Sequence, residues 1–222
     1  MSILGIDTST AASAACLLRT DGRAFEVEPP VATLAGRPGH SRDLMPAVAS
    51  VMDAGGLGFA DLSAIAVGVG PGGFTGLRIG IATARALAQA EGLGLRPVSS
   101  LAALARGIGP GRTLPLIDAR RGELFVALYE DGDELWAPFA ASAERIVELV
   151  LDAGATPLAA GDGALRSRQI LEAAGLEVAG AGSRCHVVRA LHICRLGLEA
   201  PDVPPDAVLP DYLRAPDARP SR

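Results

Sequence analysis

Gly68-Val69-Gly70-Pro71-Gly72-Gly73-Phe74-Thr75-Gly76-Leu77-Arg78-Ile79-Gly80 is the stretch that decides the fold of this chain. It carries six glycines and directly follows the apolar, strand-like residues 64–67. Glycine loses much conformational entropy on folding, so this density marks backbone that turns sharply or is approached closely by other backbone or by a phosphate. The two interpretations are an ordinary strand-to-helix turn and a functional loop.

A P-loop is the first functional alternative for this stretch, and the sequence excludes it. That motif needs a lysine after its last glycine, and all 20 basic residues of this chain are arginine. A protein-kinase lysine and a Schiff-base mechanism are excluded for the same reason.

Small residues recur every four positions in the glycine run and beyond it. Gly72, Gly76, Gly80 and Ala84 would share one face of a helix over residues 75–91. Glycine in a helix costs about 1 kcal/mol relative to alanine, and close approach of a second helix is the usual compensation. The pattern therefore predicts a helix that packs against a partner. An adjoining apolar stripe is formed by Leu77, Ile81, Ala84, Leu87 and Ala88.

Composition and length describe a globular chain. With 222 residues, 49% of them hydrophobic, it can form one large domain or two small ones. The first apolar run ends at Asp7 and no span of about eighteen uncharged apolar residues exists, so we expect neither a signal peptide nor a membrane span. Three scattered cysteines fit a reducing cytoplasm. A net charge of −5 argues that the lone chain does not hold nucleic acid.

Apolar runs and turn signals predict an α/β protein with two related halves, residues 1–108 and 109–222. In the first half we expect strands at 3–7, 14–19, 23–27, 64–67 and 97–98, with helices at 43–54, 75–91 and 100–106. Asp43 would be the N-cap of the first helix, with Pro46 in its first turn. The order then repeats, with strands at 113–118, 123–129, 135–139 and 158–160 and helices at 143–151, 165–174 and 187–198.

A set of motifs is spread over nearly the whole chain: residues 3–9, His40, 44–46, the run 70–80, 117–123 and the terminal Tyr212-Leu213-Arg214. Through these motifs the chain resembles the bacterial TsaB family. The resemblance implies the duplicated actin-like ATPase fold, also called ASKHA or ribonuclease H-like. It also implies a non-catalytic cytoplasmic scaffold subunit of the complex that attaches threonylcarbamoyl to adenosine 37 of tRNA, with no catalytic residue in this chain.

The same resemblance implies partners. The chain would form a heterodimer with the related catalytic subunit TsaD through the first two long helices of each, and the pair would recruit the ATPase TsaE. Binding of tRNA would occur only through the complex, and whether ATP or ADP binds at the partner interface, or the lone chain forms a homodimer, is left open. The expected interface residues are Leu44, Met45, Val48, Val51, Met52, Gly73, Thr75, Gly76, Leu77, Gly80, Ile81 and Ala84.

Two loops raise the alternative of a surviving actin-like ATPase or sugar kinase. Residues 7–10, Asp-Thr-Ser-Thr, resemble the first phosphate loop of that fold, although a polar strand-to-strand turn is the favoured explanation. The matching loop of the second half carries arginines where a phosphate would meet glycine N–H groups. Vestigial nucleotide or anion contacts are thus predicted at Asp7, Thr8, Ser9, Asp118, Arg120, Arg121, Gly161 and Gly163.

A metallopeptidase is the third alternative, and the histidines count against it. His40, His186 and His192 lack the spacing of four that places two imidazoles on one ion, so we expect no metal site. Ser41 beside His40 has no visible acid partner for a hydrolase triad.

Overall fold

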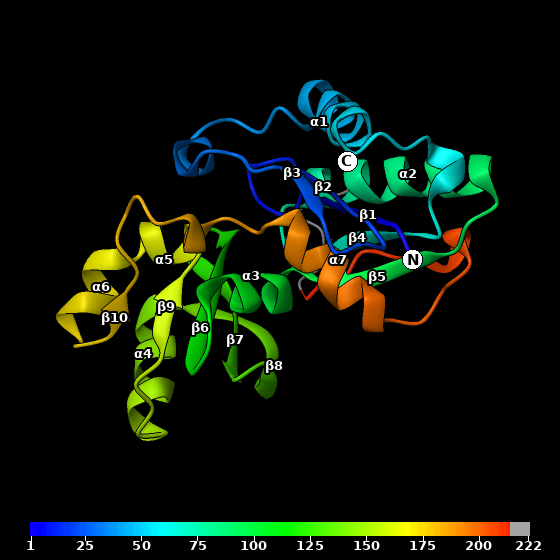
Figure 1. The fold of residues 1–222 in the computed structure, drawn as a ribbon. Coiled ribbons are helices and arrows are strands. Elements are labelled where there is room, and N and C mark those ends of the chain that lie inside the picture. Colours follow the sequence, from blue (N-terminus) through cyan, green and yellow to red (C-terminus); the bar gives the residue numbers. More distant parts are fainter. Residues whose placement is uncertain (214–222) are drawn as a thin grey trace, which may run out of the picture.

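The computed structural model describes residues 1–213, so Arg214 and the rest of the C-terminal stretch, 214–222, lie outside it. Within that range the chain forms two mixed sheets of five strands each, covered by helices (Figure 1). Every predicted strand is present, and the sequence pattern missed only the short last strand, β10.

The first sheet has the order β3-β2-β1-β4-β5. Its central strand β1 pairs antiparallel with β2 and parallel with β4. The apolar alternation of β1 places Leu4 and Ile6 on one face and Ile3 on the other. The strands are β1 Ile3–Asp7, β2 Ala14–Leu18, β3 Ala24–Val27, β4 Ala64–Gly70 and β5 Leu95–Ser99.

The second sheet repeats this order as β8-β7-β6-β9-β10, with β6 pairing antiparallel with β7 and parallel with β9. Identical strand order and direction in both sheets establish the duplication that the sequence predicted. The strands are β6 Arg112–Arg120, β7 Glu123–Glu130, β8 Asp133–Ser142, β9 Leu158–Ala160 and β10 Glu177–Val178.

Helices α1 (His40–Gly55) and α2 (Phe74–Glu91) lie on one face of the first sheet, and α7 (Ala190–Glu199) lies on the other. In the second half, α3 (Ser100–Ile108) packs on β6 and β7, opposite α4 (Ala143–Asp152), α5 (Asp162–Arg166) and α6 (Arg168–Ala173). Short 3-10 helices complete the chain at Val31–Ala35, Phe59–Asp61, Arg184–His186 and Pro205–Ala207.

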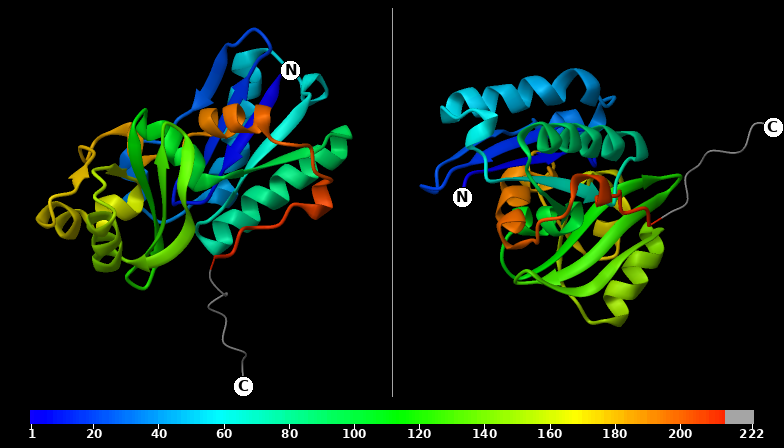
Figure 2. Two further views of the ribbon diagram at one scale, coloured as in Figure 1. Left: turned by 90° about the horizontal axis from the view of Figure 1, so that it is seen from below. Right: turned by 90° about the vertical axis from the view of Figure 1, so that its right-hand side faces the viewer.

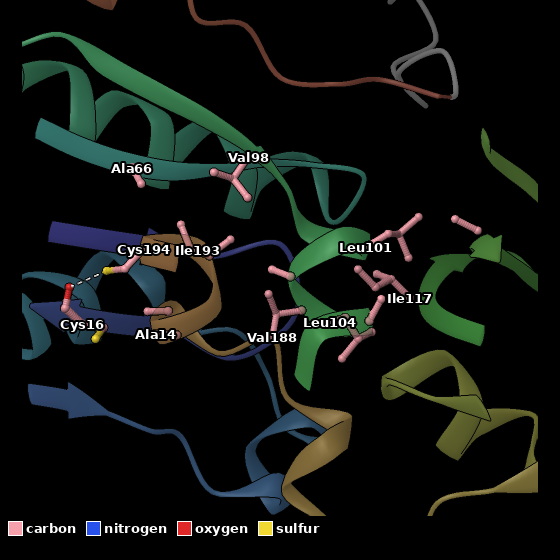
Figure 3. Packing of buried hydrophobic residues seen from close by; sticks show 14 of the residues in the cluster. Ala14, Cys16, Ala66, Val98, Leu101, Leu104, Ile117, Val188, Ile193 and Cys194 are labelled. Carbon is pink, nitrogen blue, oxygen red and sulfur yellow. Dashed lines mark hydrogen bonds between the residues drawn. The ribbon is translucent and has the colours of Figure 1, made fainter. Parts of the chain in front are cut away.

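One hydrophobic cluster joins the two halves. Figure 3 shows Ile193 and Cys194 of α7 beside Ala14 and Cys16, with Leu101 and Leu104 of α3 reaching toward Ile117. The proposed boundary between residues 108 and 109 lies at the end of α3. Each half contributes a helix to the other half: α3, from the first half, covers the second sheet, and α7, from the second half, packs on the first sheet.

The predicted first residues of two helices are wrong. In each case the helix begins where an acceptor outside it binds the N–H groups of its first turn. Helix α1 begins at His40 because the Gly39 carbonyl accepts hydrogen bonds from the N–H groups of Arg42 and Asp43, so Asp43 lies in the first turn and is not the N-cap. Pro46 lies deeper in this helix than predicted. Helix α7 begins at Ala190 and not at 187, since the Glu26 carboxylate of β3 accepts from the N–H of Leu191 at 2.9 Å.

The helix predicted over residues 165–174 is two helices, α5 and α6. The chain breaks at Ser167, whose carbonyl accepts hydrogen bonds from the N–H groups of Ile170 and Leu171 and starts the second helix. Ala164 and Leu171 are both fully buried in the core of the second half.

Candidate partner surface and interdomain cleft

The glycine face of α2 is turned toward its own chain. A Cβ at Gly76 would overlap the Thr8 carbonyl oxygen, and one at Gly80 would overlap the Thr8 hydroxyl. That hydroxyl donates a hydrogen bond of 2.8 Å to the Gly76 carbonyl. The sequence pattern alone suggested that these glycines let a second helix come close. In the structure they instead let the loop after β1 come close.

Burial divides the twelve predicted interface residues. Their exposed members are Met45 on α1 and Gly73 and Thr75 at the start of α2. The other nine fill the space between the two helices and the first sheet. These buried residues are Leu44, Val48, Val51, Met52, Gly76, Leu77, Gly80, Ile81 and Ala84.

The outer surface of the same two helices includes several short side chains. Met45 is 43% exposed, and Ala49 is exposed one turn further along α1. Ala82 and Ala86 are exposed on α2. Figure 2 shows the two helices side by side on the outside of the first half. Short side chains allow another helix to approach a helix surface closely.

Asp7 lies behind the first loop, and its carboxylate is fully engaged. One oxygen accepts hydrogen bonds from the Ser9 N–H at 2.9 Å and the Ser9 hydroxyl at 2.7 Å, and the other accepts from the Ser100 hydroxyl at 2.8 Å. Burial raises the pKa of Asp7 above its ordinary value, although the bonds from Ser9 and Ser100 act in the opposite direction. The carboxylate thus holds the loop and the start of α3 together.

A cleft between the two halves encloses a cavity of about 510 Å³. Of the predicted contact residues, the structure brings Ser9, Asp118 and Arg120 to this cavity, whereas Asp7 and Thr8 lie behind its wall. Four further lining residues, Thr10, His40, Ser41 and Tyr212, belong to motifs noted in the sequence but were not predicted as contacts of a cleft. Phe74, Asp162 and Asp211 were not predicted as contacts either, because only folding brings these segments together.

The second-half loop is occupied by ion pairs. The Asp118 carboxylate contacts the guanidinium of Arg166 at 2.6 Å and that of Arg120 at 3.3 Å. Asp162 accepts a hydrogen bond from the Asp118 N–H at 3.1 Å. Burial, together with the charge of Asp118, raises the pKa of Asp162 to about 6. Arg121 lies at the turn itself and contributes to the wall of a separate, smaller cavity.

Gly161 and Gly163 serve the packing of α5. A Cβ at Gly161 would overlap the Leu116 carbonyl oxygen of β6, and a Cβ at Gly163 would lie 2.9 Å from the same atom. The Gly161 N–H also lies 3.1 Å from Nδ1 of the buried His186. Neither glycine lines the cleft.

His40 pairs with a serine other than its sequence neighbour. Its Nδ1 lies 2.9 Å from the Ser13 hydroxyl, while Ser41 is a separate part of the cavity wall. Burial lowers the pKa of His40, so its ring is neutral at pH 7. Within residues 1–213 no group of three or more histidine, cysteine or acidic side chains is arranged to hold a metal ion.

The C-terminal segment 203–213 runs along α2 and ends over the cleft (Figure 2). Arg85 donates to the carbonyls of Asp206 and Val208. Tyr212 stacks on Phe74 with ring centroids 5.3 Å apart and accepts a hydrogen bond of 2.9 Å from Nε of Arg78. This segment closes one side of the cavity and covers part of the N-terminal turn of α2.

Comparison with known proteins places this architecture in a family. A family model described as TsaD: tRNA N6-adenosine threonylcarbamoyltransferase matches residues 31–196. The TsaB protein of Bacillus subtilis is 31% identical over 225 residues, which cover 98% of this chain and 96% of that protein. The chain belongs to the TsaB family. The TsaB protein of Escherichia coli is 37% identical over 143 residues, which cover 61% of this chain and 58% of that protein, so this alignment spans less than two thirds of the relative.

Solved structures agree with the TsaB assignment. YeaZ from Pseudomonas aeruginosa superimposes with a TM-score of 0.74 at 29% identity, covering 95% of this chain and all of that one. A second structure from that organism, described as similar to peptidase YeaZ, gives a TM-score of 0.77 over 96% of this chain and 99% of that one. The chain thus has the duplicated actin-like fold of this family. None of the helices among residues 1–213 is both long and apolar enough to cross a membrane.

Proposed function

We propose that this TsaB-family chain takes part in tRNA threonylcarbamoyladenosine biosynthesis as a non-catalytic subunit. The relatives from E. coli and B. subtilis carry that pathway in their names. One observation supports the non-catalytic role above all: the acidic residues of both loops that would meet a nucleotide are already engaged, Asp7 by Ser9 and Ser100 and Asp118 by two arginines.

The proposed partner is a TsaD-related subunit that docks on the outer face of α1 and α2. Support comes from the exposed Met45 on α1 and Thr75 on α2, and from the exposed alanines further along each of these helices. The nine buried residues of the predicted interface would act indirectly, by fixing the two helices on the sheet. A homodimer through the same face is the alternative for the isolated chain.

The finer parts of the proposal are recruitment of a TsaE-like ATPase and tRNA binding through the assembled complex. A net charge of −5 supports the latter, because affinity for nucleic acid rests largely on neutralising phosphates. An ATPase or kinase activity of this chain would require the Asp7 carboxylate to be free at the cavity. A metallopeptidase activity would require a set of metal ligands. No observation on residues 1–213 favours either activity.

Reconstitution with purified TsaD-related and TsaE-related components, together with components that form the threonylcarbamoyl donor, tests the proposal. Omitting this chain should abolish transfer to tRNA, whereas a folded Asp7→Asn variant should support it nearly as well as the wild type. Size-exclusion chromatography with light scattering should show a complex of this chain with the TsaD-related subunit. Transfer that is unchanged without the chain, or that is lost in the folded Asp7→Asn complex, would contradict the proposal.

The tRNA component is tested by titrating labelled tRNA against the lone chain and against the complex at one fixed salt concentration. The complex should bind at least tenfold more tightly. Submicromolar binding by the lone chain near physiological salt would contradict this part of the proposal.

A further inference from the structure

A second cavity, of about 300 Å³, lies away from the cleft, where the last turn of α3 meets α7. The loop before β6 and the turn between β7 and β8 complete its wall. None of its residues lines the cleft between the two halves. The lining residues are Ala105, Arg106, Gly109, Pro110, Thr113, Asp131, Gly132, His192 and Arg195.

Two arginines of this cavity have no acidic partner within residues 1–213. They are Arg106 at the end of α3 and Arg195 on α7, and both are exposed. The neighbouring Arg189 differs, because it forms ion pairs with Glu26 of β3 and with Glu28 just after that strand. Arg106 and Arg195 therefore retain their donors for a ligand.

His192 lies between these arginines and is 92% buried, since only 8% of its surface is exposed. Its ring makes no hydrogen bond within the described part of the chain, and Nε2 would lie 3.6 Å from a Cβ built on Gly107. The ring nitrogens keep some solvent access, so water or a ligand in the cavity can satisfy them.

The local potential around His192 is positive. Burial lowers the pKa of His192 to about 4, and the charges of Arg189, Arg195, Arg106 and Arg184 act in the same direction. One carboxylate opposes them in the wall, that of Asp131, which accepts a hydrogen bond of 2.8 Å from the Gly111 N–H. The carbonyl end of α3 adds a further partial negative charge. Against these stand the guanidinium groups of Arg106 and Arg195, which line the same cavity.

We propose that this cavity is a binding site for a phosphate-class oxyanion, held by the guanidinium groups of Arg106 and Arg195 and by the N–H of the His192 ring. Guanidinium donors match the oxygen spacing of phosphate and sulfate, and a neutral imidazole offers one N–H donor. Free inorganic phosphate and the phosphodiester of a nucleic acid strand present the same oxygens. The inference goes beyond the proposed function, and its test does not depend on partner binding or tRNA modification.

The test is a titration of inorganic phosphate and of sulfate, followed by NMR of the His192 ring in the full chain. The chain has three histidines, and the signals of His192 are those lost in a His192→Gln variant. We expect a saturable shift of the His192 signals and an upward shift of the His192 pKa with bound sulfate, since a neighbouring anion favours imidazolium.

Arg106→Gln and Arg195→Gln should each weaken binding by about tenfold, the loss expected for one charge-assisted hydrogen bond. Both side chains are exposed and lack ion pairs, so the variants should fold, which circular dichroism checks. Arg145→Gln is the control, because Arg145 is an exposed arginine on α4 that pairs with Glu148 and lies outside this cavity. No saturable shift of His192, or an equal loss of affinity in the control, would overturn the proposal.

A second arm separates the two sources of the oxyanion. A short single-stranded RNA that displaces phosphate, and that binds more weakly to the same two arginine variants, would identify a phosphodiester as the ligand. RNA that leaves bound phosphate in place would identify a site for the free anion. Either result supports the site itself.

Discussion

At the scale of single residues, Thr8 explains why α2 carries glycine at positions 76 and 80. The Thr8 carbonyl and hydroxyl occupy the space that two Cβ atoms would need, and the hydroxyl is bonded to the helix backbone. A helix normally gains stability when glycine is replaced by alanine. At these positions the tertiary contact reverses that preference.

Gly80→Ala should therefore destabilise the monomer by about 1 to 3 kcal/mol, because the new methyl group overlaps the Thr8 hydroxyl. Thermal unfolding would show this as a drop of roughly 2 to 4 °C per kcal/mol for a chain of this size. Gly107→Ala in α3 is the control, since a Cβ there meets His192 at an ordinary 3.5 Å and should be neutral or stabilising. Equal melting temperatures for Gly80→Ala and the wild type would contradict the assigned contact.

Asp162 predicts a dependence of stability on pH. Its folded-state pKa of about 6 exceeds the ordinary 3.8, so between these values the folded chain binds more protons at this site than the unfolded chain does. The Asp162 contribution to the free energy of unfolding therefore falls as pH rises from about 4 to about 6, by roughly 2 to 3 kcal/mol at most. Asp162→Asn should remove this fall while keeping an oxygen acceptor for the Asp118 N–H.

Denaturant unfolding of the wild type and Asp162→Asn at pH 4, 5, 6 and 7 measures the effect. The variant should gain stability relative to the wild type as pH rises, and the gain should level off above the folded pKa. A difference that stays constant over this range would show that Asp162 titrates with its ordinary pKa.

At the scale of elements, α1 and α2 each have an inner and an outer side with separate roles. The inner sides bury leucine, valine and isoleucine against the first sheet, and the outer sides expose short residues together with Met45. The C-terminal segment covers one end of this surface through the stack of Tyr212 on Phe74. A partner that docks along both helices would therefore meet this segment at the start of α2.

Met45→Glu should weaken association with a TsaD-related subunit by at least tenfold, because a carboxylate would be desolvated in the proposed interface. The side chain is 43% exposed in the monomer, so the melting temperature should change little. Leu151→Glu on α4 is the matched control, with 56% exposure of an apolar side chain in the other half. Unchanged affinity of folded Met45→Glu would place the partner elsewhere.

At the scale of the whole molecule, the two halves share a core. Helix α3 from the first half packs on the second sheet, α7 returns from the second half to the first sheet, and both meet in one hydrophobic cluster. Separation of the halves would expose Leu101, Leu104 and Ile193, which are fully buried. We therefore expect one cooperative unit.

Leu17→Ala, in the first sheet, should lower the unfolding midpoint reported by the fluorescence of Trp136, the single tryptophan, which lies on β8 in the second half. A fully buried leucine typically costs 2 to 5 kcal/mol when reduced to alanine, and cooperative unfolding transmits that loss to both halves. Far-UV circular dichroism should give the same midpoint. A Trp136 transition that does not move in the variant would show that the halves unfold independently.

The sequence by itself determined the duplicated α/β architecture. Strands such as β1 and β7 are short apolar runs closed by turn residues, and this local pattern appears in the same order twice. It also determined the family, through the run 70–80 and the motifs around it. These features are local because strand and turn preferences depend on near neighbours along the chain.

Only the tertiary structure decided which side of α2 is free and which distant side chains come together. Helical periodicity showed that Gly76 and Gly80 share a face, but it carries no information about what lies opposite, which is Thr8 from a loop 68 residues away. For the same reason the start of α7, set by Glu26, and the cavity between Arg106, His192 and Arg195 were invisible in the sequence. Contacts between distant segments arise from packing of the whole chain and leave no periodic signal in any one segment.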